Sequence, residues 1–434
     1  MKKYFNKLSP ELRKIISQAA RVSRETRLPA YLVGGCLRDL ILGVRNFDLD
    51  ITVESDGIFF AQNLAKKLKA ELIIHERFRT ATLVLPGHLK VDIATTRQEE
   101  YPSPAALPVV RPGSLKEDLR RRDFTINAMA LSLTADKEQE LIDLFGAQAD
   151  LAKGRIRILH ELSFRDDPTR ILRAVRFCQR FNFMIEPKTQ RLLKEAINDG
   201  LLAKVNPHRM RDELILMLKE QDPFGPIKKL SDLGGLSFIS VRLKIGKLTQ
   251  SLFKSIAREI AGFVKRYPAR RPLDSWLLYF AALLEGLTLP EIRTIIFRLG
   301  LRKGEEKRLV SYYQQRKKLI LSLSKKQLPP EKIYSLLEPL SYEAIILLSA
   351  TCQNKNFKKY LADFYGIYNG IRLGIRGNDL GSLGILPGPE YQKIFAKVLT
   401  AKLNGLVKNR QTEMALIRKL IQRNRNGENN NVQA

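Results

Sequence analysis

The chain has 434 residues, 44% of them hydrophobic and 28% charged, which is ordinary for a globular protein with a sizeable core. Lysine and arginine number 75 against 45 aspartate and glutamate, and the resulting net charge of +30 favours a polyanionic partner, either nucleic acid or an anionic membrane surface. Three scattered cysteines exclude a disulfide framework, and no apolar run reaches the roughly 18 residues that span a bilayer.

The first part of the chain alternates short apolar runs of period two, typical of strands, with segments of helical period. Ser9 and Pro10 open the first helix, and Pro86 and Gly87 form a turn between two strands. Residues 97–114 are rich in proline and have no period, which predicts a loop. The expected elements are a helix over 9–27, a strand over 31–35, a helix over 36–43, a strand over 47–53, a helix over 56–70, and strands over 71–78, 80–85 and 90–96.

Strand signals fade after the segment LIDLFGAQADLAKGRIRIL, and from about Ser163 nearly every segment has the pattern of an amphipathic helix. The sequence therefore predicts an α/β head with a mixed sheet of five strands, followed by an all-α remainder. We expect the head over residues 1–150, a neck over 151–220, a body over 221–330 and a tail over 331–434.

Two aspartates, Asp48 and Asp50, lie one residue apart in the predicted strand FDLDITV. Residues i and i+2 of a strand point to the same face, so the two carboxylates would repel each other unless a cation lay nearby. A hard divalent ion such as Mg²⁺ is the natural occupant, since it prefers oxygen ligands and also binds phosphate. This arrangement is typical of nucleotidyl transfer, although a pair that faces lysine or arginine would have the same spacing.

A glycine pair, Gly34 and Gly35, stands between the first predicted strand and the helix that follows it. Such a turn lets backbone N–H groups approach a phosphate, and the helix N-terminus adds positive partial charge. Arg38 lies in the first turn of that helix and can reach the same anion. Together with the aspartate pair downstream, the turn indicates a nucleotide-phosphate cradle beside a metal site.

The segment LVGGCLRDLILGVRNFDLDI resembles the signature motif of class II tRNA nucleotidyltransferases, the CCA-adding enzymes and the related bacterial poly(A) polymerases. Further blocks follow in the order of that family's motifs: RRRDFTINAMA, LIDLFGAQADLAKGRIRIL, RDDPTRILRAVRF and NPHRMRDELILML. The resemblance implies a polymerase β-like head in which Asp48 and Asp50 are catalytic and hold Mg²⁺, while Gly35 and Arg38 bind the triphosphate.

In the block RRRDFTINAMA, Arg122 and Asp123 take positions that contact the incoming nucleotide in the family. The resemblance implies that Asp123 faces the ribose hydroxyl, and a carboxylate that accepts from a 2′-hydroxyl would favour ribonucleotides. A capped helix with a solvated basic face is the alternative. The block NPHRMRDELILML contains Arg209, Arg211 and Glu213, which we expect to brace the neck helices.

The block RDDPTRILRAVRF carries Asp167, Arg170, Arg173 and Arg176 at intervals of three, so neighbours would be in contact on a helix. A carboxylate that accepts from an amino group, beside a guanidinium that donates to a ring nitrogen, fits both cytosine and adenine. Uracil and guanine present a carbonyl instead, a mismatch worth roughly 1–3 kcal/mol in a dry site. The resemblance likewise implies that this block replaces a nucleic-acid template, with Asp167 and Arg170 selecting C and A, and with Arg173 and Arg176 binding triphosphate or base. A salt-bridged helix is the alternative, and Asp166 stands where the family usually has glutamate.

The loop at 97–114 lies where the family has a flexible element that helps the site switch from CTP to ATP. We therefore expect a magnesium-dependent, template-independent enzyme that adds C and A from CTP and ATP to the 3′ end of tRNA. CC-only addition, A-only addition and poly(A) synthesis are alternatives, as are a small-molecule nucleotidyltransferase and a non-catalytic RNA-binding protein. The expected location is the cytoplasm, the expected partner is the acceptor end of tRNA, and no membrane partner is expected.

Overall fold

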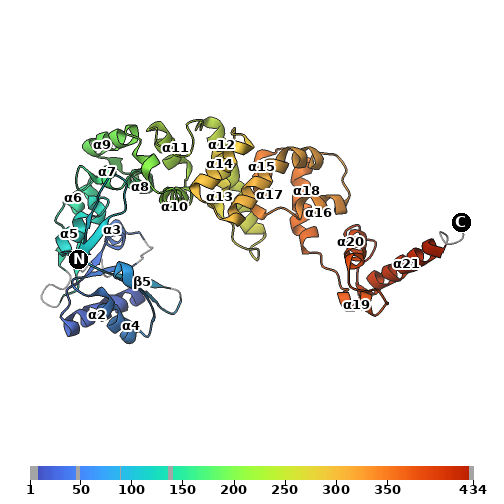
Figure 1. The fold of residues 1–434 in the computed structure, drawn as a ribbon, viewed down its shortest axis with the longest axis horizontal. Coiled ribbons are helices and arrows are strands. Elements are labelled where there is room, and N and C mark those ends of the chain that lie inside the picture. Colours follow the sequence, from blue (N-terminus) through green and yellow to red (C-terminus); the bar gives the residue numbers. More distant parts are fainter. Residues whose placement is uncertain (1–7, 45–48, 88, 135–139, 430–434) are drawn as a thin grey trace. The chain divides into compact units, whose positions relative to one another are not determined.

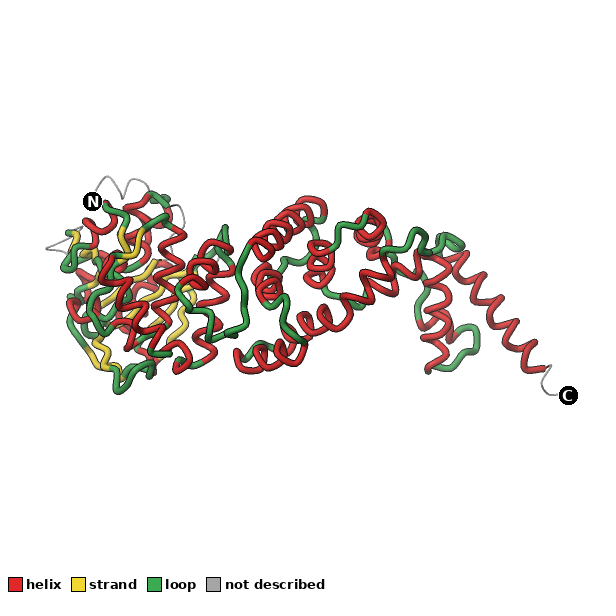
Figure 2. Tube along the Cα trace, turned by 90° about the horizontal axis from the view of Figure 1, so that it is seen from above, coloured by secondary structure: helices red, strands yellow, loops and turns green. Residues whose placement is uncertain are grey.

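The protein was analysed as a computed structural model, which describes residues 8–44, 49–87, 89–134 and 140–429. The chain forms two compact units, the first of residues 1–243 with 298–300 and the second of residues 244–297 with 301–434. All described strands belong to the first unit, and the second is built from helices and loops (Figures 1 and 2). The predicted fold class, a mixed-sheet head followed by an all-α remainder, is confirmed, whereas the finer division into head, neck, body and tail stays a prediction.

The sheet of the head has seven strands, not the expected five. β2 and β5 pair in parallel and the other neighbours are antiparallel, so the sheet is mixed. The two additional strands show no alternation in the sequence, because all three residues of β8 are buried and β9 has only two residues. Across the sheet the order is β3 (Glu71–His75), β4 (Thr80–Val84), β5 (Lys90–Thr95), β2 (Leu49–Val53), β1 (Ala30–Val33), β8 (Ala130–Ser132) and β9 (Leu141–Ile142).

The helices of the head begin and end where the sequence places caps. The side chain of Ser9 accepts from the backbone N–H of Leu12 at 3.2 Å and so caps α2 (Pro10–Thr26). Helix α4 (Gly57–Leu68) packs against β3, β4 and β5 and against α2 (Figure 1). Helix α3 (Gly35–Leu42) follows β1 directly and ends at a left-handed glycine, Gly43.

Residues 97–114 differ from the predicted loop, because they contain a two-stranded antiparallel ribbon of β6 (Arg97–Glu100) and β7 (Val109–Pro112). All four residues of β7 are exposed, so burial imposes no period on its sequence. The remaining short elements of the first unit are η1 (Glu76–Phe78), α5 (Leu115–Arg120), η2 (Thr125–Asn127), α6 (Ala147–Ala152), β10 (Arg155–Ile156), β11 (Met184–Ile185) and η4 (Leu201–Lys204).

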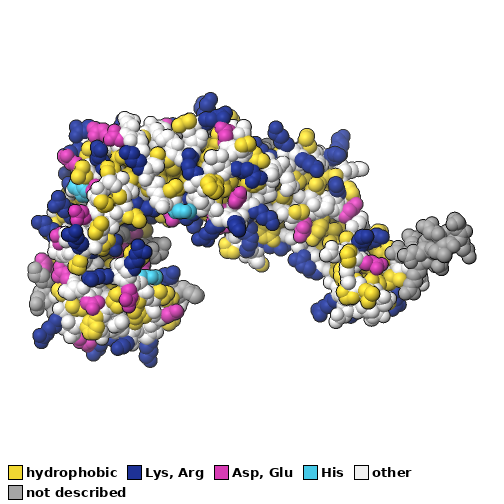
Figure 3. All heavy atoms as spheres, in the orientation of Figure 1, with side chains coloured by type: hydrophobic (Ala, Val, Ile, Leu, Met, Phe, Trp, Pro, Cys, Tyr) yellow, Lys and Arg dark blue, Asp and Glu magenta, His cyan; other side chains and the backbone are white. Residues whose placement is uncertain are grey.

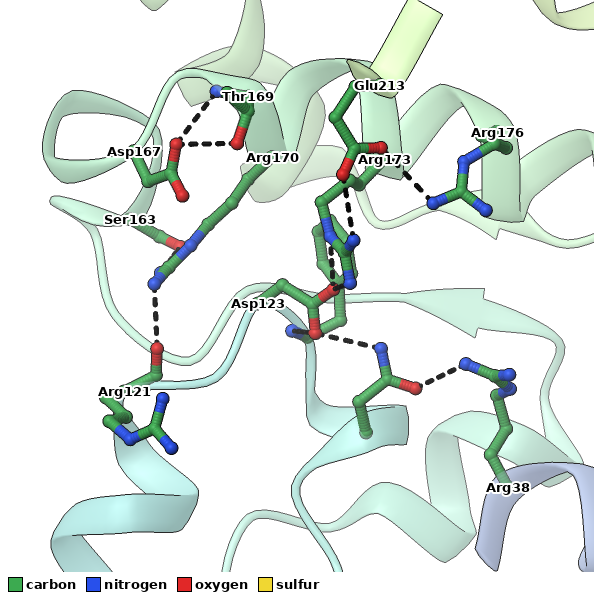
Figure 4. Close-up of polar contacts among 12 residues, drawn as sticks. Arg38, Arg121, Asp123, Ser163, Asp167, Thr169, Arg170, Arg173, Arg176 and Glu213 are labelled. Carbon is green, nitrogen blue, oxygen red and sulfur yellow. Dashed lines mark hydrogen bonds and ion pairs between the residues drawn. The ribbon is translucent and has the colours of Figure 1, made fainter. Parts of the chain in front are cut away.

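Five helices complete the first unit, and they are α7 (Ser163–Asp166), α8 (Thr169–Arg180), α9 (Pro187–Asn198), α10 (Pro207–Leu218) and α11 (Phe224–Asp232). Helix α8 packs against both α10 and α11. Its apolar residues are buried, while Arg170 and Arg173 reach toward Arg121 and Asp123 (Figure 4).

The second unit continues with α12 (Lys247–Arg266), α13 (Ser275–Leu283), α14 (Leu289–Leu299, which crosses the unit boundary), α15 (Lys303–Leu323), α16 (Pro330–Leu337), α17 (Tyr342–Thr351), α18 (Lys355–Gly366), η5 (Tyr368–Gly370), α19 (Gly377–Gly381), α20 (Pro389–Leu403) and α21 (Arg410–Asn429). Helices α19, α20 and α21 enclose a hydrophobic cluster of their own, with Leu380, Val398 and Ile417 at its centre.

Lysine and arginine side chains are spread over the visible surface of both units (Figure 3), as the net charge of +30 requires. Among the described residues, no helix taken singly has the length and apolarity to cross a membrane, although α16 and α17, bent by 109° at their junction, pass that test as a pair.

Candidate active site

A cavity of about 730 Å³ opens in the first unit, where η2, α8 and α10 face the turn between β1 and α3. Nine arginines and six acidic residues line it. Every predicted site residue that the structure describes is among the lining residues, namely Gly35, Arg38, Asp50, Arg122, Asp123, Asp167, Arg170, Arg173 and Arg176. Asp48 lies outside the described residues. Residues that are far apart in the sequence thus share one cavity, and their individual roles stay predictions.

The turn at the start of α3 has the backbone that a phosphate cradle needs. Gly34 has φ +73°, a left-handed conformation that favours glycine. A Cβ atom there would lie 2.8 Å from Nη1 of Arg122 and 3.5 Å from Oδ2 of Asp50, so glycine also leaves room beside both side chains. The N-terminus of α3, an arginine and a carboxylate therefore meet at this turn.

Arg38 is buried beneath this turn. Its Nη1 donates to Oδ1 of Asn127 at 2.6 Å, and its guanidinium carbon lies 4.7 Å from the ring centroid of Phe181 and 5.1 Å from that of Phe177. Asp39 accepts from its Nε at 2.8 Å. These contacts fix the guanidinium by stacking and hydrogen bonds, so it is held in place without a ligand.

The carboxylates of the sheet can be tested against a divalent cation. Asp50 on β2 is the register partner of Asp92 on β5, so their side chains lie on the same face of the sheet. Asp92 also accepts from the hydroxyl of Thr82 at 2.6 Å. No group of three or more His, Cys, Asp or Glu in the described ranges is placed to hold a metal. Two carboxylates on one face of the sheet, with Asp50 beside the glycine turn at the start of α3, nevertheless fit a hard cation, and Asp48 would be the further ligand.

Asp123 accepts hydrogen bonds from three residues around it in the cavity (Figure 4). Its Oδ1 accepts from the backbone N–H of Phe124 and from Nδ2 of Asn127, both at 2.8 Å. Its Oδ2 accepts from Nε and Nη2 of Arg173 at 2.9 and 2.7 Å. Burial alone would raise the pKa of Asp123, but the charge of Arg173 and these hydrogen bonds outweigh it and lower the pKa to about 2. A ribose hydroxyl would be a fifth donor to this carboxylate.

The interval of three predicts that Asp167 lies on the same helix as the arginines. The structure places it outside that helix. Helix α8 begins at Thr169, and Asp167 is the extended residue just before Pro168. Its Oδ1 accepts from the backbone N–H of Thr169 at 3.1 Å and from the Thr169 hydroxyl at 2.6 Å, and its Oδ2 accepts from Nη2 of Arg209 at 2.8 Å. The guanidinium beside this carboxylate is therefore that of Arg209.

Arg170 makes other contacts. Its Nη1 donates to the hydroxyl of Ser163 and its Nη2 to the backbone carbonyl of Arg121, each at 2.7 Å (Figure 4). Arg121 in turn donates to Glu99 of β6 at 3.0 Å and pairs with the fully buried Asp118. Arg170 is thus tied to the ribbon of β6 and β7 through Arg121.

Glu213 on α10 holds Arg173 and Arg176 of α8. Its Oε1 lies 3.0 Å from Nη1 of Arg173, and its Oε2 lies 3.2 Å from Nη2 of Arg176. Burial lowers the pKa of Arg176 despite this partner. Sequence reasoning placed Glu213 and Arg209 in a bracing helix outside the site, yet both line the cavity, one helical turn apart on the same face of α10.

Two family descriptions match the chain: "Poly A polymerase head domain" over residues 30–157 and "Probable RNA and SrmB- binding site of polymerase A" over residues 182–239. An A-adding tRNA nucleotidyltransferase of Halalkalibacterium halodurans is 33% identical over 94% of this chain and 92% of its own length. The chain belongs to the tRNA nucleotidyltransferase family. The predicted family resemblance is thereby confirmed.

Other tRNA nucleotidyltransferases are similar over most of this chain. The A-adding enzyme of Geobacter sulfurreducens is 38% identical over 93% of the chain, which spans only 46% of that longer relative. The solved structure of the CCA-adding enzyme of Thermotoga maritima complexed with tRNA is 30% identical, with a TM-score of 0.71 over 97% of this chain and 98% of its own.

Proposed function

We propose that this chain transfers nucleotides from nucleoside triphosphates to the 3′ end of tRNA, and that the terminal adenosine is among the residues it adds. The observation that carries the proposal is the single cavity in which the phosphate cradle, Asp50 and the carboxylate of Asp167 meet. A small-molecule nucleotidyltransferase would not need the second unit or a net charge of +30.

In the proposed reaction the α3 turn and Arg38 bind the triphosphate, Arg122 lies beside it, and Asp123 orients the sugar. Asp167 accepts from the exocyclic amino group of the base, which adenine and cytosine have in common and which guanine and uracil replace with a carbonyl at the corresponding position. Mg²⁺, held by Asp48 and Asp50, would activate the tRNA 3′-hydroxyl and stabilise the departing pyrophosphate. Arg173 and Arg176 bind triphosphate or base after exchanging Glu213 for the ligand.

Two versions of this activity have separate support. Addition of A alone is favoured by the names of the Halalkalibacterium and Geobacter relatives. Addition of the full CCA sequence is favoured by the likeness to the Thermotoga enzyme over nearly the whole of both chains. The tRNA acceptor end is the proposed partner in both cases, and a cytoplasmic location stays a prediction.

Product sequencing separates the two versions. Purified protein is incubated with ATP and CTP and with tRNA that lacks CCA, ends in C, or ends in CC. Extension of the CC end alone identifies an A-adding enzyme, and extension of all three ends to CCA identifies a CCA-adding one. A generic RNA oligomer in parallel detects poly(A) synthesis. Absence of extension on every tRNA end would refute the proposal.

The carboxylate pair is tested with Asp48→Asn and Asp50→Asn. Each change keeps the side-chain shape and removes a negative ligand, so we expect incorporation of labelled nucleotide to fall by at least about a hundredfold at unchanged thermal stability. Asp56→Asn is the matched control, because Asp56 is exposed, caps α4 and does not line the cavity, and asparagine caps a helix equally well. Full activity in Asp50→Asn would contradict the metal assignment.

A further inference from the structure

Three arginine side chains surround one aromatic ring in the cavity. The guanidinium carbon of Arg176 lies 4.8 Å from the ring centroid of Phe177. The corresponding distances are 5.1 Å for Arg38 and 5.4 Å for Arg173. Phe177 and the three arginines all line the cavity, and Arg38 extends from α3 toward α8 (Figure 4). One ring therefore contacts cations both from the start of α3 and from α8.

Other aromatic side chains fix the orientation of this ring. Phe177 is 4% exposed, and the ring of Phe124 meets it edge-on, with centroids 6.0 Å apart and planes at 83°. The ring of Phe181 stacks on it, with centroids 5.8 Å apart and planes at 28°. Because packing holds the ring of Phe177, the ring can serve as a fixed support for the long arginine side chains around it.

Three like charges around one ring repel each other unless other groups attract them. Glu213 pairs with Arg173 and Arg176, and Asp39 pairs with Arg38. The electron-rich face of an aromatic ring also attracts a guanidinium group, and it does so without occupying the N–H donors. Those donors stay available for oxygen acceptors at the edge of the guanidinium plane. A ligand that displaces Glu213 would therefore leave the contacts with the ring in place.

We propose that Phe177 is a positioning residue that holds Arg38, Arg173 and Arg176 in place for the triphosphate of the incoming nucleotide. The inference rests on the proposed function and deepens it. Phe177 acts through the arginines, and its ring needs no hydrogen bond with the nucleotide. Side chains that are held before the ligand arrives lose less entropy when they bind it. The contribution of the ring should therefore grow with the number of phosphates on the ligand.

The test compares wild type with two variants at position 177. Phe177→Leu keeps an apolar side chain but removes the ring, whereas a trifluorinated phenylalanine in place of Phe177 keeps the ring and cancels most of its charge separation. Phe183→Leu is the matched control, because Phe183 packs against Phe181 at 5.7 Å but does not line the cavity. The measurements are equilibrium binding of ATP and of AMP, and steady-state kinetics of ATP incorporation into tRNA that ends in CC.

We expect both variants at position 177 to bind ATP at least about fivefold more weakly than wild type, while AMP affinity changes by less than about twofold. KM for ATP should rise with the loss of affinity, and the fluorinated protein should keep its thermal midpoint. Phe183→Leu should bind ATP as wild type does.

An unchanged ratio of ATP to AMP affinity in the fluorinated protein would overturn the proposal, whether both affinities stay the same or both fall. A wild type that binds ATP no more tightly than AMP would overturn it as well. If Phe177→Leu does not fold, the fluorinated protein alone decides. Wild type that binds ATP but extends no tRNA would refute the proposed function, while the affinity ratios would still test Phe177.

Discussion

Replacing Asp123 with asparagine would remove the charge at the centre of the cavity while keeping the shape of the side chain. Asp123 is 92% buried and accepts two hydrogen bonds from Arg173, one from Asn127 and one from a backbone N–H. The amide would place a donor or a weaker acceptor opposite the guanidinium. Arg173 would keep Glu213 as its remaining acidic partner.

The magnitude follows from the pKa of Asp123, which is lowered from its ordinary 3.8 to about 2. That difference corresponds to about 2 kcal/mol of stability at neutral pH. Because the pKa is lower in the folded state, this contribution is complete above the unfolded pKa and disappears as the pH falls through the folded one. Roughly half of it is lost by pH 3. We therefore expect Asp123→Asn to be less stable by about 2 kcal/mol at pH 7 and by about half as much at pH 3.

The assay is urea unfolding of wild type and variant at pH 7, 5, 4 and 3, followed by far-UV circular dichroism. The single tryptophan, Trp276, lies in α13 of the second unit, so its fluorescence serves as an internal control that the substitution should leave unchanged. Asp56→Asn, a change of an exposed carboxylate, should shift neither signal. A difference between wild type and Asp123→Asn that is absent at pH 7, or that does not shrink toward pH 3, would refute the reasoning.

Three further predictions concern other parts of the chain. Gly34→Ala places a Cβ 2.8 Å from Nη1 of Arg122 on a left-handed backbone, so we expect about 1 kcal/mol of strain and weaker triphosphate binding, measured by titration with ATP. Glu343→Gln removes a fully buried carboxylate that holds Arg271 at 2.7 and 2.8 Å. Burial would raise the pKa of Glu343, but its contacts with Arg271 outweigh burial and lower the pKa to about 2. The urea midpoint that Trp276 fluorescence reports should therefore fall at neutral pH. The logarithm of the association constant for tRNA should fall steeply and linearly with the logarithm of the salt concentration. Filter binding measures this affinity, and an affinity that does not change with salt would contradict phosphate recognition.

The elements with strong local signals could be predicted from the sequence. All five expected strands of the sheet are present, since their alternation reflects burial on one face. The predicted first helix agrees with α2 because Ser9 and Pro10 act locally. The strands β6 to β9 could not be found, because β6 has no apolar residue, β7 is wholly exposed, and β8 and β9 depend on pairing with other strands.

The residue types at the candidate site were predictable, but their pairing was not. Intervals of three suggested that Asp167 shares a helix face with Arg170, whereas Pro168 places Asp167 before the helix, where it can turn toward α10. The partner on α10 is 42 residues away in sequence, and no local pattern encodes such a contact. The signal that was available was the i, i+4 spacing of Arg209 and Glu213, which puts a cation and an acid on one face of the same helix.

The acid partners of the cavity arginines also bear on which anions can compete for the site. A chloride or inorganic phosphate ion from solution must displace a tethered carboxylate such as Glu213, which loses little freedom when it rebinds. Such an ion makes only one contact and loses its translational freedom on binding, so it displaces the carboxylate poorly. A nucleoside triphosphate engages several guanidinium groups at once and loses that freedom only once. The carboxylates that pair with the cavity arginines therefore favour ligands with several negative charges over monovalent salt ions. The cavity should bind little chloride or inorganic phosphate despite its nine arginines.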